Sequence, residues 1–303
     1  MADISRSEVA SLIEEAYSQS LLQSAVAAST ALTAFPTVSM GTKVTNMPVL
    51  ATLPEAGWVT ESATDAAGVK PTSEVTWANK TLVAEEIAVI LPVHENVIDD
   101  ATVETLDELA ALGGSAIGKK LDQAVLFGTQ KPASWTSAAL LPAAVAAGQT
   151  IANVDGVANV ADLFGSVNQA AQALAEAGYI PDTLLASLAL RYRLANLRDG
   201  DGNLAFRDES FAGFGTHFNR NGAWDGTAAE AIVVDSSRVR IGVRQDITVK
   251  FLDQATVGGI NLAERDMVAL RIKARFAYVL GNGATALGAS KTPVAAVTPD
   301  VTP

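Results

Sequence analysis

The chain of 303 residues contains no cysteine and only two histidines, His94 and His217, which lie far apart in sequence. The absence of cysteine excludes disulfides and thiolate metal sites. With so few histidines there are few ways to build a catalytic or metal-binding cluster, so a structural or solvent-facing role is favoured for both. An enzyme is therefore a disfavoured alternative, and no cofactor or metal is expected.

Charge is sparse as well, at 18% of residues against 49% hydrophobic, and the net charge is −12. Proteins whose main task is to grip nucleic acid need clustered Lys and Arg, so this balance argues against that task. The charge is also uneven, because residues 236–303 hold nine basic and five acidic residues while the first 235 hold 12 and 28. The head of one copy could thus meet the tail of another.

Signals for secretion or membrane insertion are missing. Asp3 and Glu8 occupy the place of a basic n-region, and the uncharged stretch 16–42 is too rich in Ser, Thr and Gln to prefer lipid. No membrane partner is expected.

The longest helical pattern runs from Asp99 to Gly128, with Asp99 and Asp100 at the N-cap and Gly128 as the C-terminal glycine. At 1.5 Å per residue such a helix spans roughly 40 Å, which predicts an elongated subunit. Its apolar face consists of Val103, Leu106, Ala110, Ile117, Leu121, Ala124 and Val125.

Two motifs in the chain come close to ligand-binding loops. Gly113 to Lys120 departs by one residue from a phosphate-binding loop but falls inside the helical pattern, so small residues at a close packing contact are favoured. Asp199 to Asn203 begins like a calcium loop, but Leu204 replaces the required glycine and Ser210 the required glutamate, which favours a surface turn.

The N-terminal third reads as an arm followed by extended chain. Ser5 and Glu8 form a capping-box pattern that predicts a helix from near Arg6 to about Ala34. A strand is predicted at Val83 to Val93, and residues 72–82 could pair with residues 56–62 in a long hairpin. A lone hairpin is marginal in water, so a neighbouring subunit is expected to cover it.

The rest of the chain predicts a small α/β unit followed by two long strands. An Ala-rich connector reaches about Val160, a helix is predicted at 161–177, and a strand or turn with a short helix at 181–197. Strands are predicted at 239–251 and 268–280, joined by the turn 253–262. Their outward Arg and Lys stripe could face DNA, but a solvated face or acidic residues of a neighbour are favoured. Residues 290–303 are expected to form a loose tail.

This order of parts resembles the major capsid protein of tailed bacteriophages with the Hong Kong 97-type fold. The segments that carry the resemblance are Trp58-Val59-Thr60-Glu61, Trp77-Ala78-Asn79-Lys80, Ile98-Asp99-Asp100, Lys120-Leu121-Asp122, Phe127-Gly128 with Pro132, Leu197-Arg198-Asp199 with Gly202, and Val243-Arg244-Gln245-Asp246-Ile247-Thr248.

The resemblance implies an α+β fold divided as follows: N-terminal arm 1–49, extended β-hairpin loop 50–82, peripheral domain with the spine helix 83–150 and 239–280, and inserted axial domain with the C-terminal tail 151–238 and 281–303. Pentamers and hexamers would close an icosahedral phage head, the virion shell around double-stranded DNA, which each copy contacts weakly. Scaffolding, portal and decoration proteins are possible partners, the scaffold being a separate protein or none, and assembly would occur in the host cytoplasm.

The candidates for contacts between subunits are Glu61, Trp77, Lys80, Arg244, Asp253 and Asn261. Some members of the family join a lysine to an asparagine covalently; no spacing rule selects Lys70 or Lys80 with Asn261, so no cross-link is expected. An encapsulin-type nanocompartment shell, which has the same fold, is the alternative function.

Overall fold

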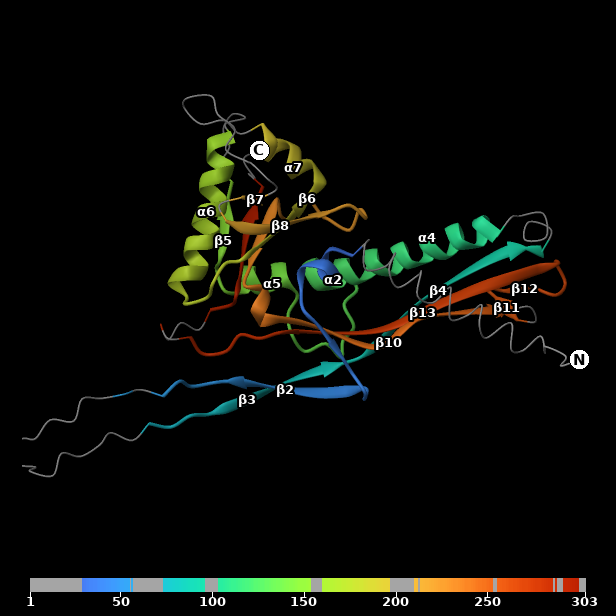
Figure 1. Ribbon diagram of the computed structural model, residues 1–303, viewed down its shortest axis with the longest axis horizontal. Coiled ribbons are helices and arrows are strands. Elements are labelled where there is room, and N and C mark those ends of the chain that lie inside the picture. Colours follow the sequence, from blue (N-terminus) through green and yellow to red (C-terminus); the bar gives the residue numbers. More distant parts are fainter. Residues whose placement is uncertain are drawn as a thin grey trace, which may run out of the picture.

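The computed structural model describes residues 29–54, 56, 73–95, 103–153, 160–196, 210–211, 213–252, 255–285, 287 and 291–299. Figure 1 shows an elongated molecule in which a long helix lies along one sheet and a second sheet, covered by helices, stands at one end of that helix. The predicted capping residues Asp99 and Asp100 and the motif at Asp199 to Asn203 lie outside the described residues.

The long helix is α4 (Val103–Asp122), which continues into a single π-helical turn, η1 (Gln123–Phe127). Gly128 ends it in the left-handed conformation, with φ of 74°, as predicted. Residues 113–120 are helical throughout, so the phosphate-loop alternative is wrong. Gly113 instead marks a close approach, because a Cβ there would collide with the Cδ1 atom of Ile272 in the underlying sheet.

That sheet has four strands in the order β1 (Thr37–Ser39), β10 (Val239–Leu252), β13 (Met267–Leu280) and β4 (Glu85–His94). The prediction of two long antiparallel strands near the C-terminus is confirmed, with Val239 opposite Leu280 and Val249 opposite Ile272. The loop between them contains a small hairpin of β11 (Thr256–Val257) and β12 (Ile260–Asn261), which turns at two glycines with positive φ.

The base of the extended hairpin pairs β2 (Val44–Leu50) with β3 (Trp77–Val83). Trp77 lies opposite Leu50, so the predicted pairing of this strand with residues 56–62 is wrong in register. Pro48 made residues 44–50 look unlike a strand, yet both strands of a two-stranded ribbon are edges, where proline is tolerated. Leu82 and Ala84, together with Met40, pack this base of the hairpin against the face of the four-stranded sheet opposite α4.

The second sheet has six strands and lies between two groups of helices. Helices α6 (Val160–Glu176) and α7 (Leu188–Ala195) form with strand β6 (Thr183–Ser187) the α/β pattern predicted for residues 161–197. The strand order is β5 (Thr150–Ala152), β14 (Val294–Thr298), β9 (Ala231–Val234), β6, β8 (Phe214–Asn219) and β7 (Ser210–Phe211). A short 3-10 turn, η2 (Ser236–Arg238), leads from β9 into β10.

Two sequence predictions about this region are wrong. The Ala-rich connector contains helix α5 (Leu140–Ala146) and strand β5. The predicted loose tail contains β14, which lies between β5 and β9 and is fully buried from Val294 to Val297. A short run of Val and Ala between prolines resembles a linker in sequence, but here it is buried on both faces, as interior strands are.

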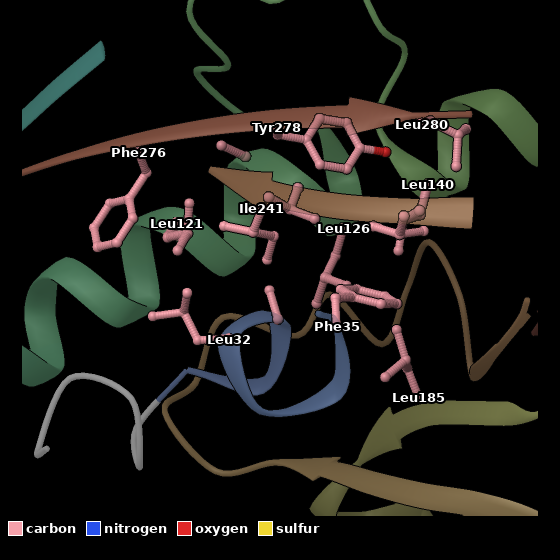
Figure 2. Packing of buried hydrophobic residues seen from close by; sticks show 14 of the residues in the cluster. Leu32, Phe35, Leu121, Leu126, Leu140, Leu185, Ile241, Phe276, Tyr278 and Leu280 are labelled. Atoms are coloured by element: carbon pink, nitrogen blue, oxygen red, sulfur yellow. The ribbon is translucent and has the colours of Figure 1, made fainter. Parts of the chain in front are cut away.

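One core joins the two sheets. Its members come from the inner face of the four-stranded sheet, from α4 and α5, and from helix α2 (Thr30–Ala34), which leads into β1. Figure 2 shows Leu32 and Phe35 of this N-terminal segment between Leu121 of the long helix and Leu185 of the six-stranded sheet. Ala31, Leu32 and Phe35, predicted to belong to a weakly apolar arm, are therefore part of this core.

A matched pair of glycine substitutions tests the packing of α4. Gly113→Ala is expected to lower the free energy of unfolding by about 1–2 kcal/mol, because overpacking against Ile272 outweighs the gain in helix propensity. Gly165→Ala in α6, where nothing lies within 4 Å of the new Cβ, should raise it by about 0.5–1 kcal/mol. Denaturant unfolding of the unassembled protomer measures both, and equal effects would contradict the close approach.

Candidate functional site

The described contact candidates lie at different places on the molecule. Trp77 and Lys80 lie on β3 of the extended hairpin, and Asn261 lies on β12 at the opposite end of the long axis. Arg244 lies between them in β10, where the pairing with β13 shifts register. Glu61 and Asp253 lie outside the described residues. The structure thus brings no single cluster together but spreads the candidates over its length.

The extended hairpin exposes apolar side chains. Trp77 is 63% exposed, and Val44, Val75 and Leu53 are exposed as well. The two chains run together beyond the strands, since Thr52 and Thr76 join their hydroxyls at 2.7 Å and Ala51 N–H donates to Thr76 O. Exposed aromatic and aliphatic residues on a two-stranded ribbon are typical of a surface that another chain covers.

A groove of about 440 Å³ follows the junction of α4 and β4. It is mainly apolar and is lined by Ile87 and Val89 of β4 and Ala116 of the helix, together with the charged Glu85 and Lys120. The strand β4 is an edge of the four-stranded sheet. A strand edge beside an apolar groove gives a neighbouring chain both backbone hydrogen bonds and a place for side chains.

A smaller hollow of about 230 Å³ contains the predicted contact residue Lys80 together with Ser137, Asn282 and Thr292. Asn261, the other residue considered for a covalent cross-link, donates its side-chain amide to Glu264 at 2.8 Å on an exposed turn. Lys70 lies outside the described residues.

A buried carboxylate, Asp122, joins three parts of the chain at the end of α4. Its oxygens accept hydrogen bonds from Ser29 Oγ at 2.7 Å and from the backbone amides of Thr30 and Ala31 at 2.9 Å. The amide groups of Asn219 and Asn221, beside the six-stranded sheet, donate at 3.1 and 2.7 Å. Asp122 is thereby bound to the start of α2 and to the end of β8.

Electrostatics at this junction are dominated by desolvation. Burial raises the pKa of Asp122, and the hydrogen bonds from Ala31, Ser29, Thr30 and Asn221 oppose that rise. Sequence reasoning missed this role, although a signal exists: Asp122 directly follows the core residue Leu121 and precedes Val125 by three residues, so it shares a helix face with apolar residues. An acid at such a position needs buried donors.

The predicted basic stripe on β13 has an acidic partner in its own chain. Arg275 lies 3.2 Å and Lys273 4.0 Å from Glu86 of β4. From the sequence, acidic residues of a neighbouring subunit are expected to pair with this stripe. At least one of the pairing carboxylates, that of Glu86, instead comes from the same sheet.

The two histidines show no catalytic arrangement. His217 is half-buried in β8, where burial lowers the pKa of its imidazole, and His94 is exposed at the end of β4. Among the described residues no three His, Asp or Glu side chains are grouped as metal ligands. Within those same residues, none of the helices combines the length and apolarity needed to cross a bilayer.

Comparisons with known proteins agree with one another. The model of the Phage capsid family matches residues 10–285. A solved chain of Mycobacterium phage Adephagia is 71% identical over 100% of both chains, with a TM-score of 0.83. A chain of Microbacterium phage Oxtober96 is 42% identical over 90% of this chain and 91% of its own, with a TM-score of 0.77.

More distant structures share the fold. The capsid of an empty GTA particle is 15% identical over 89% of both chains, with a TM-score of 0.62. No curated protein sequence matches the chain.

Proposed function

The chain belongs to the Phage capsid family and is a structural major capsid protein, and we propose that its copies form pentamers and hexamers that close an icosahedral head around double-stranded DNA. The observation that carries the proposal is the extended hairpin. It exposes Trp77, Val44 and Val75, which no packing within the described protomer covers. A shell supplies neighbours on every side of each protomer, and such neighbours would bury these residues.

The same premise extends to the division of the chain and to its partners. We assign residues 1–49 to an arm, 50–82 to the extended loop, 83–150 with 239–280 to a peripheral domain, and 151–238 with 281–303 to an axial domain. Scaffolding, portal and decoration proteins are proposed partners, and assembly in the host cytoplasm precedes incorporation into the virion. Glu61, Trp77, Lys80, Arg244, Asp253 and Asn261 remain our candidates for contacts between subunits.

An encapsulin-type shell is not favoured, since the solved chains above 70% identity come from mycobacterial phages. An enzyme is not favoured either, because the chain belongs to a family of structural proteins.

Assembly is the direct test of the proposal. Purified protein, alone or co-expressed with its scaffold, is expected to form closed particles of megadalton mass, because each exposed surface recurs on every copy. Light scattering gives the mass, and electron microscopy shows whether pentamers and hexamers are present. A protomer that stays monomeric under all conditions, including expression with the scaffold, would refute the proposal.

A further inference from the structure

One face of the four-stranded sheet is basic over half its length. In the register of the strands, Lys250 lies opposite Arg271, and Arg275 lies opposite Glu86. Lys273 lies between the two arginines on the same strand, so all of these side chains leave the sheet on one side. Among the described side chains, four basic residues there face the carboxylate of Glu86. The arrangement leaves an excess of positive charge on a protein whose net charge is −12.

This is the side of the sheet opposite α4, since Leu270 and Ile272 point from the alternate positions of β13 into the core. Toward the extended hairpin the same side is covered, because Ala277 and Val279 pack against Met40. The basic half begins where that cover ends. We call this half, formed by Lys250, Arg271, Lys273, Arg275, Glu86, Ala88 and Ile90, the basic sheet face.

In the described protomer the basic sheet face is partly uncovered, and some of its polar atoms have no hydrogen-bond partner among the described residues. Lys250 is exposed, and Ile90, opposite Arg271, is 39% exposed. Arg271 Nε and Thr248 Oγ1 have no hydrogen-bond partner among the described residues. Cations interleaved with apolar side chains suit an amphipathic acidic segment better than a phosphate backbone, whose contacts with protein do not use apolar groups.

We propose that the basic sheet face binds the acidic N-terminal segment, residues 1–28, of a second copy of this chain. This interface between copies rests on the proposed shell function. The segment carries Asp3, Glu8, Glu14 and Glu15 against the single basic residue Arg6. Its charge is therefore opposite to that of the face.

The spacing of the charges also matches. The capping box predicts a helix on which Glu8, Leu12 and Glu15 share one side. Glu8 and Glu15 are then about 10 Å apart along the helix axis. Arg271 and Arg275 are about 13 Å apart along their strand. Leu12 then places an apolar side chain between the two glutamates, which suits the exposed Ile90 opposite Arg271.

A second copy fits better than the same chain because of where the described chain begins. Ser29 bonds to Asp122 on the α4 side of the sheet, and Leu32 packs in the core on that side. A segment preceding Ser29 would have to pass around the sheet to reach its own basic face. The segment of a neighbour in the shell faces no such obstacle.

Charge reversal with rescue tests the contact. Lys250→Glu with Lys273→Glu is expected to lower the yield of closed shells at least about tenfold, since like charges across an interface are strongly unfavourable. Adding Glu8→Lys and Glu15→Lys should restore the yield to within about twofold of the original chain. The matched control adds Glu176→Lys and Asp225→Lys, which change the net charge equally at exposed positions elsewhere and should restore nothing.

The absence of cysteine allows the second copy to be identified. Chains carrying only Lys273→Cys are co-assembled with chains carrying only Glu8→Cys, and disulfides are formed with an added oxidant. Linked dimers that require both variants support the proposal. A third chain carries both changes. If a disulfide forms within that single chain but no linked dimers form in the mixed assembly, the proposal is overturned.

The remaining outcomes are also decisive. Normal shells from the charge-reversed chain that fail to retain DNA would assign the face to DNA and overturn the proposal. Normal shells with normal DNA content would overturn it as well. If the unaltered chain forms shells but the variants do not give the results expected above, the interface proposal is wrong and the shell function stands. If the unaltered chain forms no shell, the proposed function itself is wrong.

Discussion

Shortening the extended hairpin is expected to leave a folded protomer that forms no closed shell. The two chains of the hairpin are already adjacent at Thr52 and Thr76, so residues 53–75 can be replaced by Asn-Gly, a pair that favours a tight turn between antiparallel strands. The pairing of β2 with β3, and the contact of Leu82 with the sheet, lie outside the deletion. Circular dichroism and thermal unfolding of the protomer should therefore change little.

Assembly should fail because the deletion removes surface that only neighbours can bury, including the exposed residues Leu53 and Val75. Electron microscopy and light scattering are expected to show loss of essentially all closed particles, while smaller oligomers persist. A control chain keeps the length but scrambles residues 53–75; it should fail as well if specific contacts matter, and assemble if length alone matters. Shells formed by the shortened chain would contradict the role of the hairpin in assembly.

The largest elements could be predicted from sequence because their patterns are long and local. The 3.6-residue spacing toward Gly128 and the alternation around Ile241 and Ile272 each extend over more than ten residues, so tertiary contacts do not override them. The same holds for the helix at 161–177. The order of these elements then identified the capsid fold, which the family match confirms.

Short buried pieces could not be predicted, because their character depends on distant partners. Residues 294–298 form a strand only because β5 and β9 lie on both sides, and their Val and Ala have no periodic signal. Leu50 pairs with Trp77 across a long loop, and the proline at 48 masked the strand. Asp122 is of the same kind, since its five donors come from residues about 90 or more positions away.

Asp122→Asn is expected to lower the free energy of unfolding of the unassembled protomer by about 3–5 kcal/mol, the cost of leaving buried donors without an acceptor. An asparagine offers one oxygen in place of two, and its NH₂ group would face the donors of Ser29, Asn219 and Asn221. At least part of the network would lose its partner. Because the network joins α2 to α4 and to β8, the N-terminal segment should loosen first.

Two measurements separate this local effect from a general one. Hydrogen exchange at the amides of Thr30 and Ala31 should become about a hundredfold faster, as a loss of roughly 3 kcal/mol in local stability implies. The matched control is Asp225→Asn, the same chemical change at an exposed turn where the carboxylate accepts from the backbone amide and the hydroxyl of Thr227; its effect should stay below about 1 kcal/mol. Equal effects of the two variants would contradict a special role for Asp122.

The pH dependence of stability gives a further distinction, and its sign follows from the direction of the pKa shift. Burial raises the pKa of Asp122 above the ordinary value of 3.8, so the folded protein holds this proton more tightly than the unfolded chain. The contribution of this proton to the free energy of unfolding is fully present below about pH 4 and is lost as the pH rises through the raised pKa. Above that pKa, titration of Asp122 no longer changes the stability. Asp122→Asn cannot titrate and should lack that component. Denaturant unfolding from pH 3.5 to 7 measures the free energy of unfolding of the original chain and of Asp122→Asn, and the gap between these two values should narrow as the pH rises. A gap that widens would mean that the five hydrogen bonds to the carboxylate outweigh its desolvation.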